Sequence, residues 1–389
     1  MRVQVCIIGG GPSGLLLSHL LEGAGIETVI LERQSRDYVL SRIRAGVLEG
    51  GTVQVLREAG LAARMDVEGF PHHGTYVAAR NQGFRIDFTD LVGKEVMVYG
   101  QTEVTTDLYA ARDAAGGTII HNAEDVDISG ADSDTPVVSY RKDGMDHEVR
   151  CDWIAGCDGF HGASRAAIPS NVLNVVERVY PFGWLGVLSR TRPAADELIY
   201  ANHERGFALA SMRNAQLSRY YIQAAVDDPI EKWTDDAFWD ELRRRLPEDV
   251  AEAMETGPSI EKSIAPLRSF VASPMRWGRL FLVGDAAHIV PPTGAKGLNL
   301  AVSDVRYLSE GLIAHYRGDP TGVDGYSDRA LARVWKATRF SWWFTTLMHR
   351  FPDEHAEFAQ KMQEAEIDYL ETSRAAQTVL AENYVGLPL

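Results

Sequence analysis

Several features are scarce in this sequence. It has three cysteines, Cys6, Cys151 and Cys157, and no Cys-x-x-Cys pair, which argues against a dithiol oxidoreductase. No stretch approaches the roughly 18 consecutive apolar residues that span a bilayer, and the first apolar run breaks at glycines, unlike a signal peptide. Basic residues are also in deficit, 39 against 54 acidic ones, and the net charge of −15 disfavours binding to nucleic acid or to an anionic membrane. We therefore predict a cytoplasmic protein with no nucleic-acid partner, no membrane partner and no metal.

The most informative pattern lies at the start of the chain. An apolar strand is followed by Gly9-x-Gly11-x-x-Gly14, an apolar helix, and a second apolar strand that ends on Glu32. Glycines at these positions let the backbone turn tightly and approach a pyrophosphate at the helix N-terminus. A carboxylate 18 residues after Gly14 can bond the ribose hydroxyls of a dinucleotide. The pattern predicts a Rossmann-like dinucleotide-binding unit.

Two later clusters extend this prediction. A buried strand at residues 280–283 delivers Asp285, and a turn at residues 294–299 begins a predicted helix at residues 300–312. The positive end of that helix is suited to the pyrimidine edge of a flavin. The third cluster, at residues 157–165, contains Asp158 followed by glycine. Its spacing differs slightly from the commonest form of the motif.

The remaining pattern indicates an α/β protein with 389 residues and no repeats. Only one strand–glycine–helix unit is present, so one dinucleotide is bound permanently and a second binds elsewhere or briefly. The predicted division is a Rossmann-like FAD-binding domain at 1–175, with a strand and helix returning at 279–312, a β-rich substrate domain at 176–278, and a helical C-terminal interface region at 313–389.

The three motifs in this order resemble those of the single-component FAD-dependent aromatic hydroxylases. Within that family, long segments are similar to members that convert 4-hydroxybenzoate to 3,4-dihydroxybenzoate, and the similarity covers nearly the whole chain. These segments are residues 30–34, 42–49, 99–103, 177–186, 198–203, 263–270, 340–343 and 381–388. The resemblance implies that NADPH reduces FAD, O2 adds to the reduced flavin, and the flavin hydroperoxide hydroxylates the ring ortho to the phenol.

The resemblance also implies a substrate pocket. Arg213 is expected to pair with the benzoate carboxylate, since an arginine fork suits a planar carboxylate, and Ser211 and Tyr221 add hydrogen bonds. Tyr200 is expected to bond the phenolic oxygen, and Tyr384 is expected to bond Tyr200.

A proton path is required because oxygen transfer is electrophilic and a phenolate is a better nucleophile than a phenol. By resemblance, His72 ends the path from the two tyrosines near solvent. From the residues alone, the neighbouring His73 competes with His72. The carbonyl of Pro292 is expected to face the phenol of the substrate.

Residues that bind the flavin are implied both inside and outside the motifs. They are Gly9, Gly11, Ser13, Gly14, Glu32, Arg33, Arg42, Arg44, Val47, Gln101, Asp158, Arg219, Asp285, Lys296, Leu298 and Asn299. Arg219 is expected to help hold the isoalloxazine in a closed position over the substrate. In this family the ring swings outward to meet the nicotinamide.

The nicotinamide donor is expected along a second set of residues. They are Arg33, Gln34, Tyr38, Arg42, Arg44, His161 and Arg268. Arginines near a 2′-phosphate favour NADPH over NADH. Arg36 adds positive charge to this loop while Asp37 opposes it, so NADH stays an alternative.

Aromatic side chains gather in the last part of the chain. They are Trp335, Phe340, Trp342, Trp343, Phe344 and Phe351. They indicate either core packing or the interface of a homodimer, which the family favours. The alternative functions are another flavin reaction, such as that of a halogenase or an ene reductase, and a flavoprotein that only binds ligands. The Trp-x-Trp-x-Ile-Pro segment usual in halogenases of this fold is absent.

Overall fold

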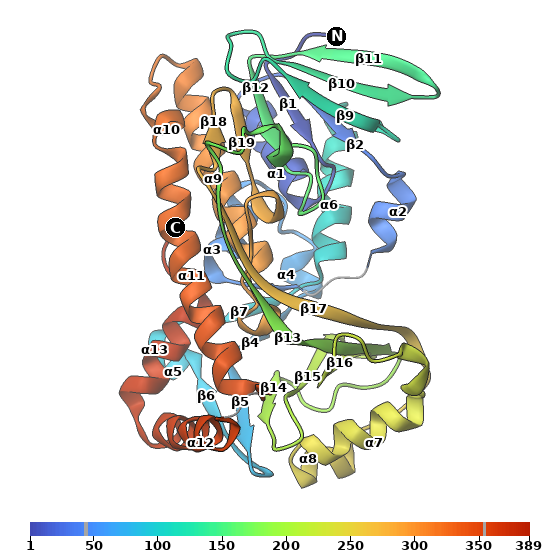
Figure 1. The fold of residues 1–389 in the computed structure, drawn as a ribbon, viewed down its shortest axis with the longest axis vertical. Coiled ribbons are helices and arrows are strands. Elements are labelled where there is room, and N and C mark those ends of the chain that lie inside the picture. The colour runs from blue at the N-terminus through green and yellow to red at the C-terminus, as the bar shows by residue number, and fades with distance from the viewer. Residues whose placement is uncertain (43–45, 353–354) are drawn as a thin grey trace.

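Two large sheets, joined by two long strands, organise the chain (Figure 1). The computed structural model describes residues 1–42, 46–352 and 355–389. The six-stranded sheet has the order β18-β19-β12-β1-β2-β8. Its strands are β1 (Val5–Ile8), β2 (Thr28–Glu32), β8 (Thr118–His121), β12 (Trp153–Gly156), β18 (Arg276–Trp277) and β19 (Leu280–Leu282).

The six-stranded sheet is parallel from β19 to β8, which is why its central strands are apolar throughout. Every residue of β1 is buried. Helix α1 (Pro12–Gly23) starts with proline directly after Gly11 and packs against α6 (Gln101–Ala114) and α9 (Gly297–Tyr316). The predicted strand–turn–helix–strand unit is therefore present.

The eight-stranded sheet has the order β20-β17-β13-β16-β15-β14-β5-β6. Its strands are β5 (Gly74–Ala79), β6 (Gln82–Asp87), β13 (Asn174–Ser189), β14 (Ile199–Asn202), β15 (Ala208–Asn214), β16 (Leu217–Ala224), β17 (Ser259–Ser273) and β20 (His288–Ile289). The long strands β13 and β17 run from beside the six-stranded sheet into the eight-stranded sheet (Figure 1). One face of the sheet packs under α7 (Asp235–Arg245), and the other faces the last helices.

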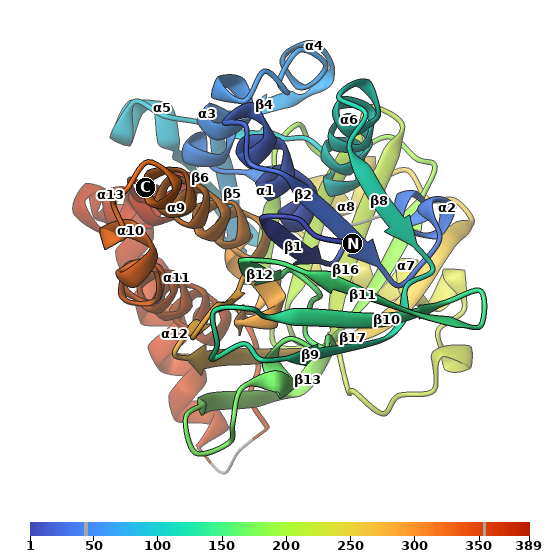
Figure 2. The same cartoon turned by 90° about the horizontal axis from the view of Figure 1, so that it is seen from above.

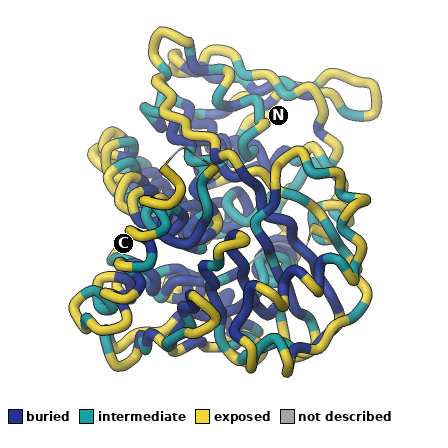
Figure 3. Tube along the Cα trace, turned by 60° about the horizontal axis from the view of Figure 1, so that its bottom comes forward, coloured by how far each residue is buried: buried dark blue, intermediate teal, exposed yellow. Residues whose placement is uncertain are grey.

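The last helices cover the second face of the eight-stranded sheet. They are α11 (Tyr326–Met348), α12 (Ala356–Thr372) and α13 (Arg374–Val385). Seen from above, they stand together on one side of the molecule with α9 and α10 (Figure 2). Buried segments line the interior of both halves while the outer loops and outer helix faces are exposed (Figure 3). No described helix is long and apolar enough to cross a membrane.

Smaller elements complete the fold. One three-stranded sheet contains β3 (Val47–Leu48), β7 (Val96–Val98) and β4 (Phe70–His72), and another contains β9 (Glu124–Ser129), β10 (Val137–Lys142) and β11 (Met145–Arg150). The short helices are α2 (Arg36–Ser41), α3 (Gly50–Glu58), α4 (Met65–Glu68), α5 (Phe88–Val92), α8 (Glu248–Ala253) and α10 (Thr321–Asp324). The predicted fold class, α/β with a β-rich part and C-terminal helices, is confirmed.

Candidate functional site

The glycine turn after β1 leaves room for a phosphate. Gly9 has a φ of +109°, and a Cβ at Gly9 or at Gly14 would collide with neighbouring backbone. In contrast, none of the described residues has an atom within 4 Å of a Cβ built at Gly11, so they leave the backbone there uncovered. Helix α1 begins directly behind the turn with its positive end. The turn therefore fits a pyrophosphate.

Glu32 is fixed beside this turn by its own carboxylate. Its Oε2 accepts a hydrogen bond from the Gly10 amide at 2.6 Å, and its Oε1 accepts one from the Gln34 amide at 2.7 Å. Each carboxylate oxygen carries further lone pairs. These remain for the hydroxyls of a ribose, which fits the predicted role.

Three further predicted residues converge on the same edge of the sheet. Asp158 Oδ2 accepts bonds from the amide and hydroxyl of Ser164, both at 2.9 Å, while its buried Oδ1 has no hydrogen-bond partner in the described part of the chain. Burial raises the pKa of Asp158. Asp285 is exposed, and a Cβ at the preceding Gly284 would lie 3.2 Å from the Ser13 hydroxyl. The unpaired Oδ1 of Asp158 fits a bound polar group.

Helix α9 begins at Gly297, three residues earlier than the sequence predicts, and within the described part of the chain its N-cap residue, Lys296, makes no side-chain capping bond. The first-turn amides, including those of Leu298 and Asn299, therefore lack a side-chain acceptor. This end of the helix suits an anionic ring edge.

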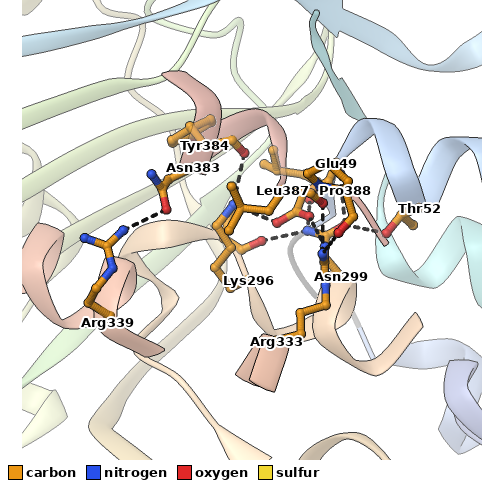
Figure 4. Close-up of polar contacts among 12 residues, drawn as sticks. Glu49, Thr52, Lys296, Asn299, Arg333, Arg339, Asn383, Tyr384, Leu387 and Pro388 are labelled. Atoms are coloured by element: carbon orange, nitrogen blue, oxygen red, sulfur yellow. Dashed lines mark hydrogen bonds and ion pairs between the residues drawn. The ribbon is translucent and has the colours of Figure 1, made fainter. Parts of the chain in front are cut away.

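The side chains of Lys296 and Asn299 bond to protein groups at this helix end (Figure 4). Lys296 Nζ donates to Glu49 Oε1 at 2.6 Å and to the Tyr384 carbonyl at 3.0 Å. Asn299 Oδ1 accepts from the Glu49 amide at 2.9 Å and the Thr52 hydroxyl at 2.7 Å. Burial lowers the pKa of Lys296, and the charge of Glu49 opposes this shift.

The strand register brings the predicted substrate residues onto one face. Tyr200 lies opposite Leu209, which lies opposite Tyr221, and Ser211 lies opposite Arg219. Residues directly opposite across a ladder share a face of the sheet. Helix α11 covers this face, with the Phe344 ring 4.9 Å from that of Tyr200.

Arg213 is a partly buried cation without a carboxylate partner among the ion pairs of the described residues. Its guanidinium donates to the Met212 carbonyl at 3.0 Å and to the Tyr221 hydroxyl at 3.4 Å, and its Nε has no partner. Burial lowers the pKa of Arg213. A partly buried arginine with a buried, unpaired Nε–H donor fits an incoming carboxylate. The Ser211 hydroxyl, in contrast, donates to the Arg219 carbonyl at 2.7 Å.

Tyr200 and Tyr384 bond to each other as the resemblance implies. Their hydroxyl oxygens are 2.8 Å apart, and both side chains are buried. Burial raises the pKa of Tyr200, with a further contribution from Tyr384, and burial also raises the pKa of Tyr384. Both hydroxyls therefore hold their protons at neutral pH. The Tyr384 ring stacks on Phe88 at 5.0 Å.

The expectation that His72 lies near solvent is wrong. Its side chain is 2% exposed, and neither ring nitrogen has a hydrogen-bond partner within the described residues. Successive residues of an extended strand point to opposite sides, so His73 turns outward and pairs with Glu95 at 3.1 Å while His72 turns inward. Burial lowers the pKa of His72, opposed by the charge of Glu197.

The residues predicted to bind the nicotinamide lie mostly on the surface. Arg33, Tyr38 and Arg42 are exposed, with the Arg42 guanidinium 5.6 Å above the Tyr38 ring. His161 is also exposed. Arg268 pairs with Glu177 at 3.1 Å. Arg44 lies outside the described residues.

Arg36 is an exception among the charges of this loop. Its guanidinium donates to both carboxylate oxygens of Asp113, at 3.1 and 2.6 Å. The charge that the sequence adds at Arg36 is therefore balanced by a residue 77 positions away.

The backbone carbonyls of three other predicted residues accept hydrogen bonds from protein groups. Exposed Pro292 begins a 3₁₀ turn (η4, Pro292–Gly294), where its carbonyl accepts the Ala295 amide at 2.9 Å. The Gln101 carbonyl accepts the Thr105 hydroxyl at 2.7 Å, and the Val47 carbonyl accepts Asn299 Nδ2 at 2.9 Å.

Gly186 on β13 is a site residue that sequence reasoning missed. It lies opposite Tyr221. A Cβ there would lie 2.8 Å from the Tyr221 ring and 3.0 Å from the Arg219 guanidinium. Glycine is thus required for these two side chains to lie across the strand. Only the strand register reveals this.

A turn for pyrophosphate, acidic residues beside it and an uncapped helix end define a protein that binds a flavin dinucleotide. Consistent with this, the family model described as an FAD binding domain matches residues 2–341. The chain belongs to this family, as a single-component FAD-dependent aromatic hydroxylase that uses NAD(P)H as co-substrate.

A closer relative narrows the class. Over 390 residues the chain is 55% identical to the p-hydroxybenzoate hydroxylase of Acinetobacter baylyi, an alignment that covers 100% of this chain and 96% of that protein. The rifampicin monooxygenase of Streptomyces venezuelae is 26% identical, covering 86% of this chain and 68% of that protein. The crystal structure of p-nitrophenol 4-monooxygenase from Pseudomonas putida shares the fold, with a TM-score of 0.82, 21% identity and 100% coverage of both chains.

Proposed function

We propose that this protein hydroxylates 4-hydroxybenzoate to 3,4-dihydroxybenzoate, with NADPH and O2 as co-substrates. The observation that carries the proposal is the pairing of two features on one sheet face. Partly buried Arg213 has no carboxylate partner among the described residues, and the buried tyrosine pair offers hydroxyls on the same face. A substrate with a carboxylate at one end and a phenol at the other matches both.

In this proposal, Arg213 binds the carboxylate and orients the ring. The Tyr221 hydroxyl, now 3.4 Å from the Arg213 guanidinium, supports it. Ser211 joins after its hydroxyl turns away from the Arg219 carbonyl. The apolar surroundings of the site exclude water, which strengthens each charged hydrogen bond.

Tyr200 and Tyr384 then move the phenolic proton. The substrate gives its proton to the Tyr200 oxygen as Tyr200 passes its own proton to Tyr384 across the 2.8 Å contact. Tyr384 passes a proton toward His72, whose orphaned ring nitrogens can accept one. No strong base is needed, because each group exchanges one proton for another.

FAD supplies the redox chemistry when bound, taking a hydride from the nicotinamide and activating O2 for transfer of one oxygen atom to the ring. The residues that would hold its pyrophosphate and ribose are Gly9, Gly11, Ser13, Gly14, Glu32, Asp158 and Asp285. The start of α9 would face its pyrimidine ring. Arg219 would hold the closed position, with its guanidinium 3.0 Å from Glu261.

NADPH is the proposed donor rather than NADH. The residues proposed to hold it are Arg33, Gln34, Tyr38, Arg42, Arg44, His161 and Arg268. Exposed Arg33 and Arg42 support a 2′-phosphate contact, while the Arg36–Asp113 pair limits it. Comparing the kcat/KM values of the two nucleotides tests this choice.

A homodimer is a further part of the proposal. Helices α11, α12 and α13 expose a set of large apolar side chains, while Phe340 and Phe344 are buried in the core. The exposed set is Trp335, Trp342, Phe358, Met362, Tyr369 and Val379. A surface of this kind is suited to a second copy. We also retain the predicted domain division and a cytoplasmic location, which the three free cysteines support.

The test is NADPH oxidation by the purified flavoprotein with and without 4-hydroxybenzoate, with the aromatic product identified by chromatography. We expect strong stimulation and formation of 3,4-dihydroxybenzoate. Stimulation without hydroxylated product would make 4-hydroxybenzoate an effector only. No stimulation with NADPH or NADH would refute the proposed reaction.

A further inference from the structure

Arg333 on α11 is a buried cation that the proposed reaction does not use. Its guanidinium donates to the carbonyls of Leu387 and Pro388, both at 2.8 Å, and to Glu49 Oε2 at 3.1 Å. Its side chain is 10% exposed. Arg333 therefore binds the segment at residues 386–389, hereafter the tail, which directly follows α13.

Glu49 links Arg333 to a second cation at the start of α9 (Figure 4). Its two carboxylate oxygens bind Lys296 at 2.6 Å and Arg333 at 3.1 Å. Lys296 also donates to the carbonyl of Tyr384 at 3.0 Å. The two cations thus hold the end of α13 and the tail, on either side of one carboxylate.

The tail lies directly against the carboxylate of Glu49. Gly386 has a φ of +101°, and a Cβ there would collide with the Glu49 carboxylate. A glycine with positive φ commonly ends a helix, and cations are favourable at the carbonyls of a helix C-terminus. Here Lys296 caps α13, which carries Tyr384, at the Tyr384 carbonyl, while Arg333 binds the two carbonyls of Leu387 and Pro388 just beyond the helix.

The contacts at the end of α13 matter because both the backbone carbonyl and the side-chain hydroxyl of Tyr384 are held by other residues. Its carbonyl is bound by Lys296, at the start of α9, and its hydroxyl is 2.8 Å from that of Tyr200. A shift of a few tenths of an ångström at the end of α13 would change this hydroxyl contact.

We propose that Arg333 is a positioning residue for the proton path: by holding the tail and Glu49, it fixes the end of α13 and so places the Tyr384 hydroxyl against Tyr200. This inference rests on the proposed function. Through Glu49 and Lys296, Arg333 also connects the tyrosine pair to the start of α9. The proton path and the start of α9 therefore keep a fixed position relative to each other. Arg333 acts through Glu49 and the tail.

The experiment compares Arg333→Gln with Arg329→Gln, a matched control one helical turn earlier. Arg329 is half exposed and pairs only with Glu310 among the ion pairs of the described residues. We measure the fraction of oxidised NADPH that yields hydroxylated product, and the pH midpoint for ionisation of bound 4-hydroxybenzoate by ultraviolet difference spectra. FAD content and thermal melting serve as folding checks.

For Arg333→Gln we expect the product fraction to fall at least twofold and the midpoint to rise, with FAD content unchanged. Arg329→Gln should match the parent, and Arg333→Lys should recover part of the loss. Gly386→Ala, which displaces the tail without changing charge, should reproduce the defect. The double variant that combines Arg333→Gln with Gly386→Ala should have a product fraction no lower than that of the more severe single variant, because both substitutions act through the tail.

Three results would overturn the inference. They are an unchanged product fraction and midpoint in Arg333→Gln, additive defects in the double variant, or an unaffected Gly386→Ala. If Arg333→Gln fails to fold, Gly386→Ala decides. If the parent protein itself makes no hydroxylated product, the proposed function fails instead, which separates the two claims.

Discussion

Replacing Arg213 by alanine removes a partly buried cation that has no carboxylate partner among the described residues on the substrate face of the sheet. The fork can make two charge-assisted hydrogen bonds to a carboxylate, each worth about 1.5–3 kcal/mol. Part of this binding energy is offset in the parent protein. There, substrate binding breaks the 3.0 Å hydrogen bond from Arg213 to the Met212 carbonyl and keeps a charge buried, and the variant avoids both costs. We therefore take the lower bound, about 3 kcal/mol in all. At about 1.4 kcal/mol per decade, the Kd rises about 100-fold or more.

The assay is titration of the oxidised flavoprotein with 4-hydroxybenzoate, followed by the change in flavin absorbance. Arg192→Ala is the control, because Arg192 is a surface arginine with 81% of its side chain exposed. 4-Hydroxybenzamide is the second control, because it has no carboxylate. The parent protein should bind the acid much more tightly than the amide, and Arg213→Ala should lose most of that preference. A Kd within threefold of the parent, or equal losses for acid and amide, would refute the assigned contact.

Three other perturbations have defined outcomes. Tyr200→Phe should keep NADPH oxidation but divert it to hydrogen peroxide, measured by peroxide yield; full coupling would show that Tyr200 does not activate the phenol. Gly186→Ala should weaken substrate binding about tenfold, since its Cβ would lie 2.8 Å from the Tyr221 ring. An unchanged Kd would contradict the need for glycine beneath the Tyr221 ring. His349 accepts the Trp184 indole N–H at 2.7 Å, and burial lowers its pKa to about 3. Its folded pKa lies below its ordinary value of 6.5, so the stability it contributes is present above pH 6.5 and lost as pH falls from 6.5 toward 3, by up to about 1.4 kcal/mol per unit. His349→Gln should therefore flatten the fall of Tm between pH 6.5 and 5, and equal slopes would contradict this.

Local sequence signals were sufficient for the nucleotide turn but not for the geometry around the substrate. Gly14 was predictable because a Cβ there would meet the Gly9 carbonyl within the same turn. Gly9 was predictable from its place in the glycine pattern, although the backbone that a Cβ there would meet is that of Cys157. The resemblance supplied Arg213 and the tyrosine pair. Neither the need for glycine at position 186 nor the burial of His72 follows from neighbouring residues, because both depend on strand pairing.

Long-range ion pairs were the least predictable feature. Glu49 and Lys296 are 247 positions apart, and Glu49 and Arg333 are 284 apart. Arg36 looked like a free surface charge until the fold placed Asp113 against it. Such pairs are set by packing of whole elements, for which no local pattern exists.

The proposed reaction places one atom of O2 on the ring of 4-hydroxybenzoate. The most direct measurement is a single reaction under ¹⁸O2 in ordinary water, with the product analysed by mass spectrometry. We expect 3,4-dihydroxybenzoate carrying one ¹⁸O, in the new hydroxyl group. Unlabelled dihydroxy product, or NADPH oxidation that yields only labelled hydrogen peroxide, would contradict it.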